Sequence, residues 1–262
     1  MTHPSETFSR AGSDAAVADL PPPPPLTVSS ETALFLDFDG TLVEIADHPD
    51  LVRVPEDLGA RIEALSRRLE GRLAIITGRS IQALEALLGP LDVAIAGSHG
   101  GEFRETGTSA VVPLAEPLPA RAVEGLRAFS EANGGLIVEA KPFGVAVHTR
   151  THPHLLDQLI ELTESLAAEL GIKTKRGKQV VELVMPGSDK GSAVDKFMSL
   201  PLFAGTKPLF LGDDVTDEDA FKVMERHGGA GVLIGPPRAT AAHWRLNSVA
   251  AVHDWLRGAD QA

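Results

Sequence analysis

The sequence predicts an α/β protein with a Rossmann-like parallel sheet, interrupted by an inserted α+β block. Short apolar runs alternate with amphipathic helical patterns from Ala33 onwards, and this rhythm resumes after Pro186-Gly187. Between about Pro113 and Pro186 the pattern changes to alternating strands with two helices. Acidic and hydroxyl side chains directly follow the apolar runs, where open α/β sheets bind their ligands. These observations predict both the fold class and the edge of the sheet that carries the function.

The elements are expected in the following order. Before the inserted block we expect strands at 33–36, 72–77 and 92–96 and helices near 56–70 and 80–88, because strands buried on both faces read as continuous apolar runs. Within the block we expect helices around 119–132 and 153–169 and strands at 136–139, 145–149, 172–174 and 179–184. After the block we expect helices at 190–199, 217–226 and 248–257 and strands at 208–211 and 231–234.

This order divides the chain into segments 1–30, 31–112, 113–186 and 187–262. The first is poor in large apolar residues and contains the run from Pro21 to Pro25, which favours polyproline II and cannot pair in a sheet. We expect it to be a disordered tail that buries little, and its protein partner, if it has one, is unknown. The second and fourth segments form the core, and the third forms an inserted domain.

Composition restricts the function. The chain has 262 residues, a formal net charge of -12 and 43% hydrophobic residues. The negative charge argues against nucleic acid or an anionic membrane as partner. The absence of cysteine excludes disulfides, thiolate zinc sites and cysteine nucleophiles and fits a reducing cytoplasm. With no apolar run long enough to span a bilayer and no signal peptide pattern, we expect a cytoplasmic protein that binds a small molecule.

The first motif, Asp37-Phe38-Asp39-Gly40-Thr41, places two acids at the end of a buried strand. Gly40 allows a sharp turn, and Thr41 adds a hydroxyl donor beside any bound anion. Two carboxylates next to anion donors indicate metal-assisted phosphoryl chemistry. A turn rich in Asp and Gly is the alternative interpretation of this segment.

Two further motifs supply groups for a phosphate. Thr77 ends another apolar strand and is placed to donate to a phosphate oxygen, with Gly78 and Arg79 beside it at a helix start. Lys190 also stands near a helix start, where a cation opposes the helix dipole. This placement is easier to explain if Lys190 points inward to neutralise a phosphoryl group than if it is a solvated surface lysine.

The fourth motif, Gly212-Asp213-Asp214-Val215-Thr216-Asp217, again follows an apolar strand. Thr216 and Asp219 have capping-box spacing, so helix initiation partly explains the presence of Asp217 and its acidic neighbours. Asp213 and Asp214 precede the cap, and a bound cation would offset their mutual repulsion. Carboxylates together with a substrate phosphate describe a Mg²⁺ site.

In this order the motifs resemble the signature motifs of haloacid-dehalogenase (HAD) phosphatases, over almost all of the chain after the tail. The resemblance implies that Asp37 is a nucleophile that forms an aspartyl-phosphate and that Asp39 is the acid and base. It also implies that Thr77 and Lys190 hold the phosphoryl group. Mg²⁺ would be bound by Asp37, the Asp39 backbone carbonyl and Asp213, with Asp214 as a further candidate. The inserted block would be a cap that excludes water and reads the leaving group.

Within the block, the segments from Glu139 to Arg150 and from Gly177 to Gly191 resemble trehalose-6-phosphate phosphatases, as do Gly97-Ser98-His99-Gly100 and Trp244-Arg245-Leu246. Charged groups of both signs suit a polyhydroxyl sugar, because each fixes a hydroxyl by a charge-assisted hydrogen bond. A solvated sheet face is the alternative for each of them. The candidate substrate-binding residues are Gly40, Thr41, Gly78, Arg79, His99, Glu139, Lys141, Arg150, Lys178 and Glu182.

The sequence therefore favours a Mg²⁺-dependent phosphomonoesterase that hydrolyses trehalose 6-phosphate. Alternatives of the same class are a sucrose-phosphate or mannosyl-phosphoglycerate phosphatase and a phosphohexomutase. A different class is a non-catalytic sugar-phosphate sensor. The presence of Asp39 argues against a sensor, because binding alone does not need a proton-transfer acid.

Overall fold

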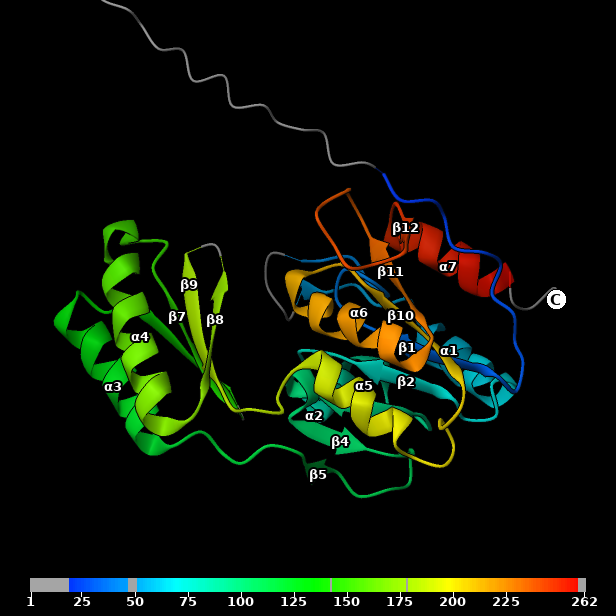
Figure 1. The fold of residues 1–262 in the computed structure, drawn as a ribbon, viewed down its shortest axis with the longest axis horizontal. Helices are drawn as coiled ribbons and strands as arrows, with labels where there is room; N and C mark the ends of the chain where they lie inside the picture. Colours follow the sequence, from blue (N-terminus) through cyan, green and yellow to red (C-terminus); the bar gives the residue numbers. More distant parts are fainter. Residues whose placement is uncertain (1–18, 47–50, 142, 178, 259–262) are drawn as a thin grey trace, which may run out of the picture.

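The computed structural model describes residues 19–46, 51–141, 143–177 and 179–258, and Figure 1 shows them as two sheets with separate sets of helices. The larger sheet, with the helices on its faces, forms the core. The smaller sheet with its two helices is inserted between β5 and α5, and we call it the cap (residues 120–184). None of the helices in the described ranges is long and apolar enough to cross a membrane.

The core sheet has the order β12-β11-β10-β1-β2-β3-β4-β5. Its strands from β12 to β3 are parallel, and β4 and β5 continue it in antiparallel pairing. The strands are β1 (Thr32–Leu36), β2 (Leu73–Ile76), β3 (Ala94–Gly97), β4 (Glu102–Arg104), β5 (Val112–Pro113), β10 (Lys207–Gly212), β11 (Ala230–Ile234) and β12 (Trp244–Leu246). Because β1 lies between β10 and β2, the carboxyl ends that carry the predicted motifs meet at one edge of the sheet.

Each central strand buries both of its faces. Leu34 and Leu36 of β1 belong to one apolar cluster, whereas Ala33 and Phe35 belong to the other. The first cluster packs against α1 (Leu58–Arg68), α2 (Ile81–Leu88) and α7 (Val249–Gly258). The second packs against α5 (Lys190–Met198) and α6 (Glu218–Met224). Successive side chains of a strand point to opposite faces, so a strand covered on both sides is apolar throughout, as the sequence predicts.

The cap is a four-stranded antiparallel sheet with the order β6-β7-β9-β8. Its elements are α3 (Ala120–Ala132), β6 (Ile137–Lys141), β7 (Gly144–His148), α4 (Leu156–Leu170), β8 (Lys173–Gly177) and β9 (Val180–Val184). Both helices pack on one face of this sheet, against Val145, Val147, Val181 and Leu183. Figure 1 shows α3 and α4 on the side away from the core, so the opposite face of the sheet is turned toward the core.

Part of the predicted disordered tail is ordered against the core, which corrects the expectation for residues 19–30. Leu26 is only 2% exposed and belongs to the first apolar cluster. The carbonyl of Pro21 accepts a hydrogen bond from the Arg245 backbone N–H at 3.0 Å, and that of Pro24 accepts one from the Trp255 indole at 2.8 Å. Polyproline carbonyls have no internal partners, so they can accept bonds from β12 and α7, beside which this segment runs in Figure 1. Residues 1–18 of the predicted tail lie outside the described residues.

The strands β4, β5 and β12 were not expected. They have three, two and three residues, which is too short for a periodic apolar pattern to be recognised. Short 3-10 helices lie at Ser98–Gly100, Pro153–Leu155, Val215–Asp217 and Glu225–His227; the second and fourth fall at the ends of helices expected at 153–169 and 217–226. Two of these, at Ser98–Gly100 and Val215–Asp217, lie beside the candidate site.

Candidate active site

Three carboxylates converge where β1 and β10 end. Asp37 directly follows β1, and Asp213 and Asp217 follow β10; one oxygen from each lies within 4.8 Å of the others. Lys190, at the start of α5, donates to Asp37 Oδ1 at 2.7 Å and to Asp217 Oδ1 at 2.5 Å. Asp37, Asp217 and Lys190 are buried. We call these four residues the acidic cluster. With one ammonium for three carboxylates, the cluster has the composition of a cation site.

Two glycines permit this close packing. A Cβ atom at Gly40 would lie 2.1 Å from Asp213 Oδ2, and one at Gly212 would lie 2.3 Å from Asp217 Cγ. Gly40 also has a φ of +80°, which other residues rarely adopt. Any side chain at these positions would push the carboxylates apart.

Burial and mutual repulsion set the charge of the cluster. Burial raises the pKa of Asp37 well above its ordinary value, although Lys190 opposes this. Burial and then the charge of Asp217 raise the pKa of Asp213 to about 6. Burial disfavours the charged form of Lys190, but Asp217 and Asp37 outweigh it and raise the Lys190 pKa. The lysine therefore stays charged. A second cation would stabilise the carboxylate charge that the single Lys190 ammonium does not neutralise.

The other predicted groups for the phosphoryl transfer lie around Asp37. Thr41 donates its hydroxyl to Asp37 Oδ2 at 3.3 Å. The guanidinium of Arg79 forms two hydrogen bonds of 2.7 Å to the Asp39 carboxylate, which fixes this side chain. Thr77 is fully buried at the end of β2, and its hydroxyl oxygen accepts the Arg79 backbone N–H at 3.2 Å. The expected substrate-binding residue Arg79 thus contacts the predicted acid.

His99 lies beside these groups in the 3-10 helix after β3. Burial, followed by Lys190 and Lys141, lowers its pKa well below the ordinary value, so the ring is neutral. A Cβ atom at Gly78 would lie 2.7 Å from the imidazole, so Gly78 is the residue that leaves room for it. His99 also has a φ of +57°, a strained conformation that is found mainly where the surroundings impose it.

A cleft of about 1040 Å³ separates the cap sheet from the core. Side chains with period-two spacing on the cap strands face it: Glu139, Lys141, His148, Lys173, Lys175 and Glu182. On the core side it is lined by His99, Asp189, Gly191 and Asp214, among other residues that adjoin the acidic cluster. The cleft therefore lies between predicted sugar-binding residues of the cap and core residues that adjoin the acidic cluster.

Charged pairs already order part of this cap face. Lys141 Nζ lies 2.9 Å from Glu182 Oε1, and His148 Nε2 lies 3.1 Å from Glu139 Oε2. Arg150, in contrast, is exposed after β7 and is not among the described residues that line the cleft. Lys178 lies outside the described residues.

The fourth motif differs from its prediction. The capping box pairs Asp214 with Asp217, not Thr216 with Asp219: the Asp214 backbone N–H donates to Asp217 Oδ2 at 2.9 Å. Asp214 is exposed and caps the 3-10 helix, so it does not join the acidic cluster, whereas Asp217 does. Sequence reasoning missed Asp217 because helix initiation explained it equally well. Its place at the end of the Gly212-Asp213-Asp214-x-x-Asp217 motif was the available signal.

Comparisons with known proteins agree with this arrangement. Residues 35–250 match the family model described as trehalose-phosphatase. The chain is 39% identical over 231 residues to the trehalose-6-phosphate phosphatase of Escherichia coli (strain K12). This match covers 87% of this chain and 86% of the relative.

Two solved structures have the same fold. The C-terminal domain of the C. albicans trehalose-6-phosphate phosphatase covers 88% of this chain and 93% of its own, with a TM-score of 0.72 and 24% identity. A haloacid dehalogenase-like hydrolase from Bacteroides thetaiotaomicron covers 86% of this chain and 98% of its own, with a TM-score of 0.61 and 17% identity. At these identities the two similarities concern the fold alone.

Proposed function

Because this chain belongs to the trehalose-phosphatase family of HAD phosphatases, we propose that it hydrolyses trehalose 6-phosphate to trehalose and phosphate through an aspartyl-phosphate. The observation that carries the mechanism is the Asp37 carboxylate, held by Thr41 and Lys190 at the end of β1. A fixed, desolvated carboxylate beside a cation is suited to nucleophilic attack. The HAD core would carry the catalytic residues, and the inserted cap would cover them.

In the first step a carboxylate oxygen of Asp37 attacks phosphorus, and the bond from phosphorus to the sugar oxygen breaks. Asp39 gives its proton to the departing sugar oxygen, which leaves as trehalose. In the second step Asp39 takes a proton from water as that water attacks the aspartyl-phosphate, which releases phosphate and restores Asp37. In the structure Arg79 binds both oxygens of the Asp39 carboxylate, so Asp39 must leave this pair before it carries a proton. Lys190 and the hydroxyl of Thr77 hold the phosphoryl oxygens.

We propose Mg²⁺ as the metal, because an all-carboxylate set next to a phosphate is typical of this ion. Asp37 and Asp213 would hold it, with the Asp39 backbone carbonyl as a third ligand, and Asp217 belongs to the same group of carboxylates. When bound, the ion would offset the repulsion between the phosphate and the carboxylates. The cluster fits a cation because it contains three carboxylates and only one ammonium group, that of Lys190.

The cap would recognise the sugar. Glu139, Lys141 and Glu182 face the cleft and can exchange their present ion pairs for hydrogen bonds to hydroxyl groups. His99 would lie beside the phosphoester, between the core and Lys141. These proposed roles rest on the position of each side chain on the cleft and on the family's substrate class.

The experiment is phosphate release from a panel of trehalose 6-phosphate, sucrose 6-phosphate, glucose 6-phosphate and mannosyl-3-phosphoglycerate. We expect the specificity constant to be highest for trehalose 6-phosphate. An equal or higher value for another sugar phosphate would reject the substrate but keep the phosphatase. No turnover of any phosphate ester with Mg²⁺ present would reject the enzyme and favour a sugar-phosphate sensor. The Asp37→Asn variant, purified in parallel, controls for contaminating phosphatases.

With this substrate and no cysteines, we also propose a cytoplasmic location. Fractionation of cells that express a tagged protein checks it. Recovery of the protein outside the cytoplasm would contradict it.

A further inference from the structure

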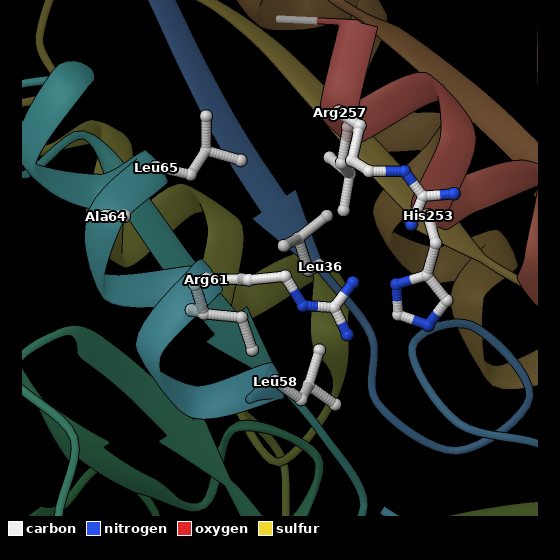
Figure 2. A pocket seen from close by; sticks show the side chains of 9 residues that line it. Leu36, Leu58, Arg61, Ala64, Leu65, His253 and Arg257 are labelled. Carbon is white, nitrogen blue, oxygen red and sulfur yellow. The ribbon is translucent and has the colours of Figure 1, made fainter. Parts of the chain in front are cut away.

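A second cavity lies away from the cleft, between α1 and α7 and above the end of β1 (Figure 2). Its volume is about 90 Å³. The apolar part of its wall consists of Leu36, Leu58, Ile62, Ala64, Leu65 and Leu256. Figure 2 shows the side chains of Arg61, His253 and Arg257 around the same space. The cavity therefore combines an apolar floor with a basic rim.

The rim has a local excess of positive charge in a chain whose net charge is -12. None of the described residues that line the cavity is acidic. Arg61 pairs with Asp57 at 3.2 Å and Arg257 pairs with Asp254, but the two carboxylates are 69% and 71% exposed, so water screens both pairs. Arg61 Nε is buried and has no hydrogen-bond partner among the described residues. An anion at the rim would be attracted to the two guanidinium groups, because these exposed carboxylates neutralise their charge only weakly.

His253 adds a third polar group. Its Nε2 lies 3.0 Å from the Leu42 carbonyl, to which it must donate. Burial, followed by the charge of Arg61, lowers the His253 pKa, so the ring is neutral and Nδ1 is a hydrogen-bond acceptor. The rim thus offers two guanidinium donors, which suit the two oxygens of a carboxylate, whereas the acceptor Nδ1 of His253 does not bond to a carboxylate.

We propose that this cavity binds a small amphipathic anion, namely a carboxylate that carries a short branched apolar group. The size supports this class, since a closed cavity of about 150 Å³ holds benzene, so the smaller space here suits about three or four carbon atoms. The apolar group would contact Leu58, Ile62 and Leu65, and the carboxylate would lie between Arg61 and Arg257. This site is separate from the catalytic cleft and does not depend on the proposed function.

The cavity is connected to the catalytic loop. Leu36 on its floor directly precedes Asp37, and His253 holds the carbonyl of Leu42. The Leu42 backbone N–H in turn donates to the Phe38 carbonyl at 2.8 Å, within the turn that contains Asp39 and Gly40. An occupant in contact with His253 and Leu36 should therefore change the environment of this turn.

The test is a titration of the full-length, metal-loaded protein with isovalerate, followed by amide NMR shifts and by the melting temperature. For a ligand of this size we expect a Kd of about 1 mM. We expect shifts at Ile62, Leu65 and Leu256 and, through His253, at Leu42. At roughly ten times the Kd the melting temperature should rise by about 3 °C. Acetate, which lacks the branch, and 3-methylbutan-1-ol, which lacks the charge, should each bind about tenfold more weakly.

Variants separate the site from general effects. The double change Arg61→Gln with Arg257→Gln and the single change Ala64→Phe, which fills the exposed rim of the cavity, should each abolish the isovalerate shifts. Arg67→Gln, at an exposed arginine of the same helix that does not line the cavity, should leave them intact. The proposal is overturned if isovalerate does not saturate by about 50 mM, if acetate binds equally well, or if the shifts map to the cleft.

Discussion

Lys190 lies between two buried carboxylates, and its charge opposes the rise that burial causes in the pKa of Asp37. The lysine donates to Asp37 and to Asp217 and is only 3% exposed. A buried pair of this kind is retained for its position rather than for stability, since its desolvation costs about as much as the attraction provides. We therefore propose that Asp217 positions Lys190 for the reacting phosphate.

The Asp37→Asn variant should lose turnover of trehalose 6-phosphate by at least about a thousandfold, because an amide cannot attack phosphorus. The fold should survive, because asparagine has nearly the same shape and Lys190 keeps its bond to Asp217. Phosphate release and circular dichroism measure the two effects. Residual activity within about tenfold of wild type would contradict the role of Asp37 as nucleophile.

Asp213 makes the metal response dependent on pH. Its folded pKa of about 6 lies above that of an unfolded aspartate, so the metal-free protein loses stability as the pH rises from about 4 to 6. Metal binding needs the carboxylate, so at pH 5 it must release a proton at a cost of about 1 kcal/mol. Mg²⁺ should therefore raise the melting temperature more at pH 7.5 than at pH 5.

The comparison needs one control. In Asp213→Asn the side chain no longer titrates, and we expect the Mg²⁺-induced rise at pH 7.5 to be small. An equal rise at both pH values in the wild type would contradict a metal site that includes Asp213.

At the scale of elements, the segment 19–30 is a structural part of the core. Leu26 is almost fully buried, so Leu26→Ala should destabilise the fold by about 2 to 4 kcal/mol through the cavity that it leaves. Leu51→Ala makes the same change at a side chain of which 66% is exposed and should cost less than about 0.5 kcal/mol. Urea unfolding measures both. If Leu26→Ala behaved like Leu51→Ala, the docking of this segment would contribute nothing.

Local patterns account for the elements that could be predicted. The central strands carry continuous apolar runs because helices cover both faces, and the cap strands alternate because only one face is covered. The docking of the segment that contains Leu26 could not be predicted, because Pro24 bonds to Trp255 of α7, which is 231 residues away in the sequence. Asp217 bonds to Lys190, which is 27 residues earlier in the sequence. The motif marked Asp217 as a candidate, but its bond to Lys190 becomes visible only in the folded chain.

At the scale of the whole molecule, the proposed reaction requires the cap and the core to act together. Asp37, Thr77 and Lys190 lie in the core, whereas Glu139, Lys141 and Glu182 lie in the cap. The cleft of about 1040 Å³ is at the upper end for small-molecule sites, so we expect the cap to approach the core when a disaccharide phosphate binds. Binding energy from the sugar would then contribute to the chemical step.

Among the described residues, ion pairs already join the cap to the core, namely Lys173 to Asp189 at 3.4 Å and Lys175 to Asp219 at 3.6 Å. Asp189 directly precedes Lys190 and caps α5, so the first pair connects the cap to the lysine that we propose to bind the phosphate. Each partly exposed pair contributes about 0.2 to 1 kcal/mol, so the double variant Lys173→Gln with Lys175→Gln should lower the specificity constant for trehalose 6-phosphate roughly two- to thirtyfold. p-Nitrophenyl phosphate, which has no sugar for the cap to hold, should be affected less. Arg121→Gln breaks an exposed pair inside the cap, with Glu169, and should change neither value. An equal loss on both substrates, or the same loss in Arg121→Gln, would show that these lysines do not couple cap position to sugar recognition.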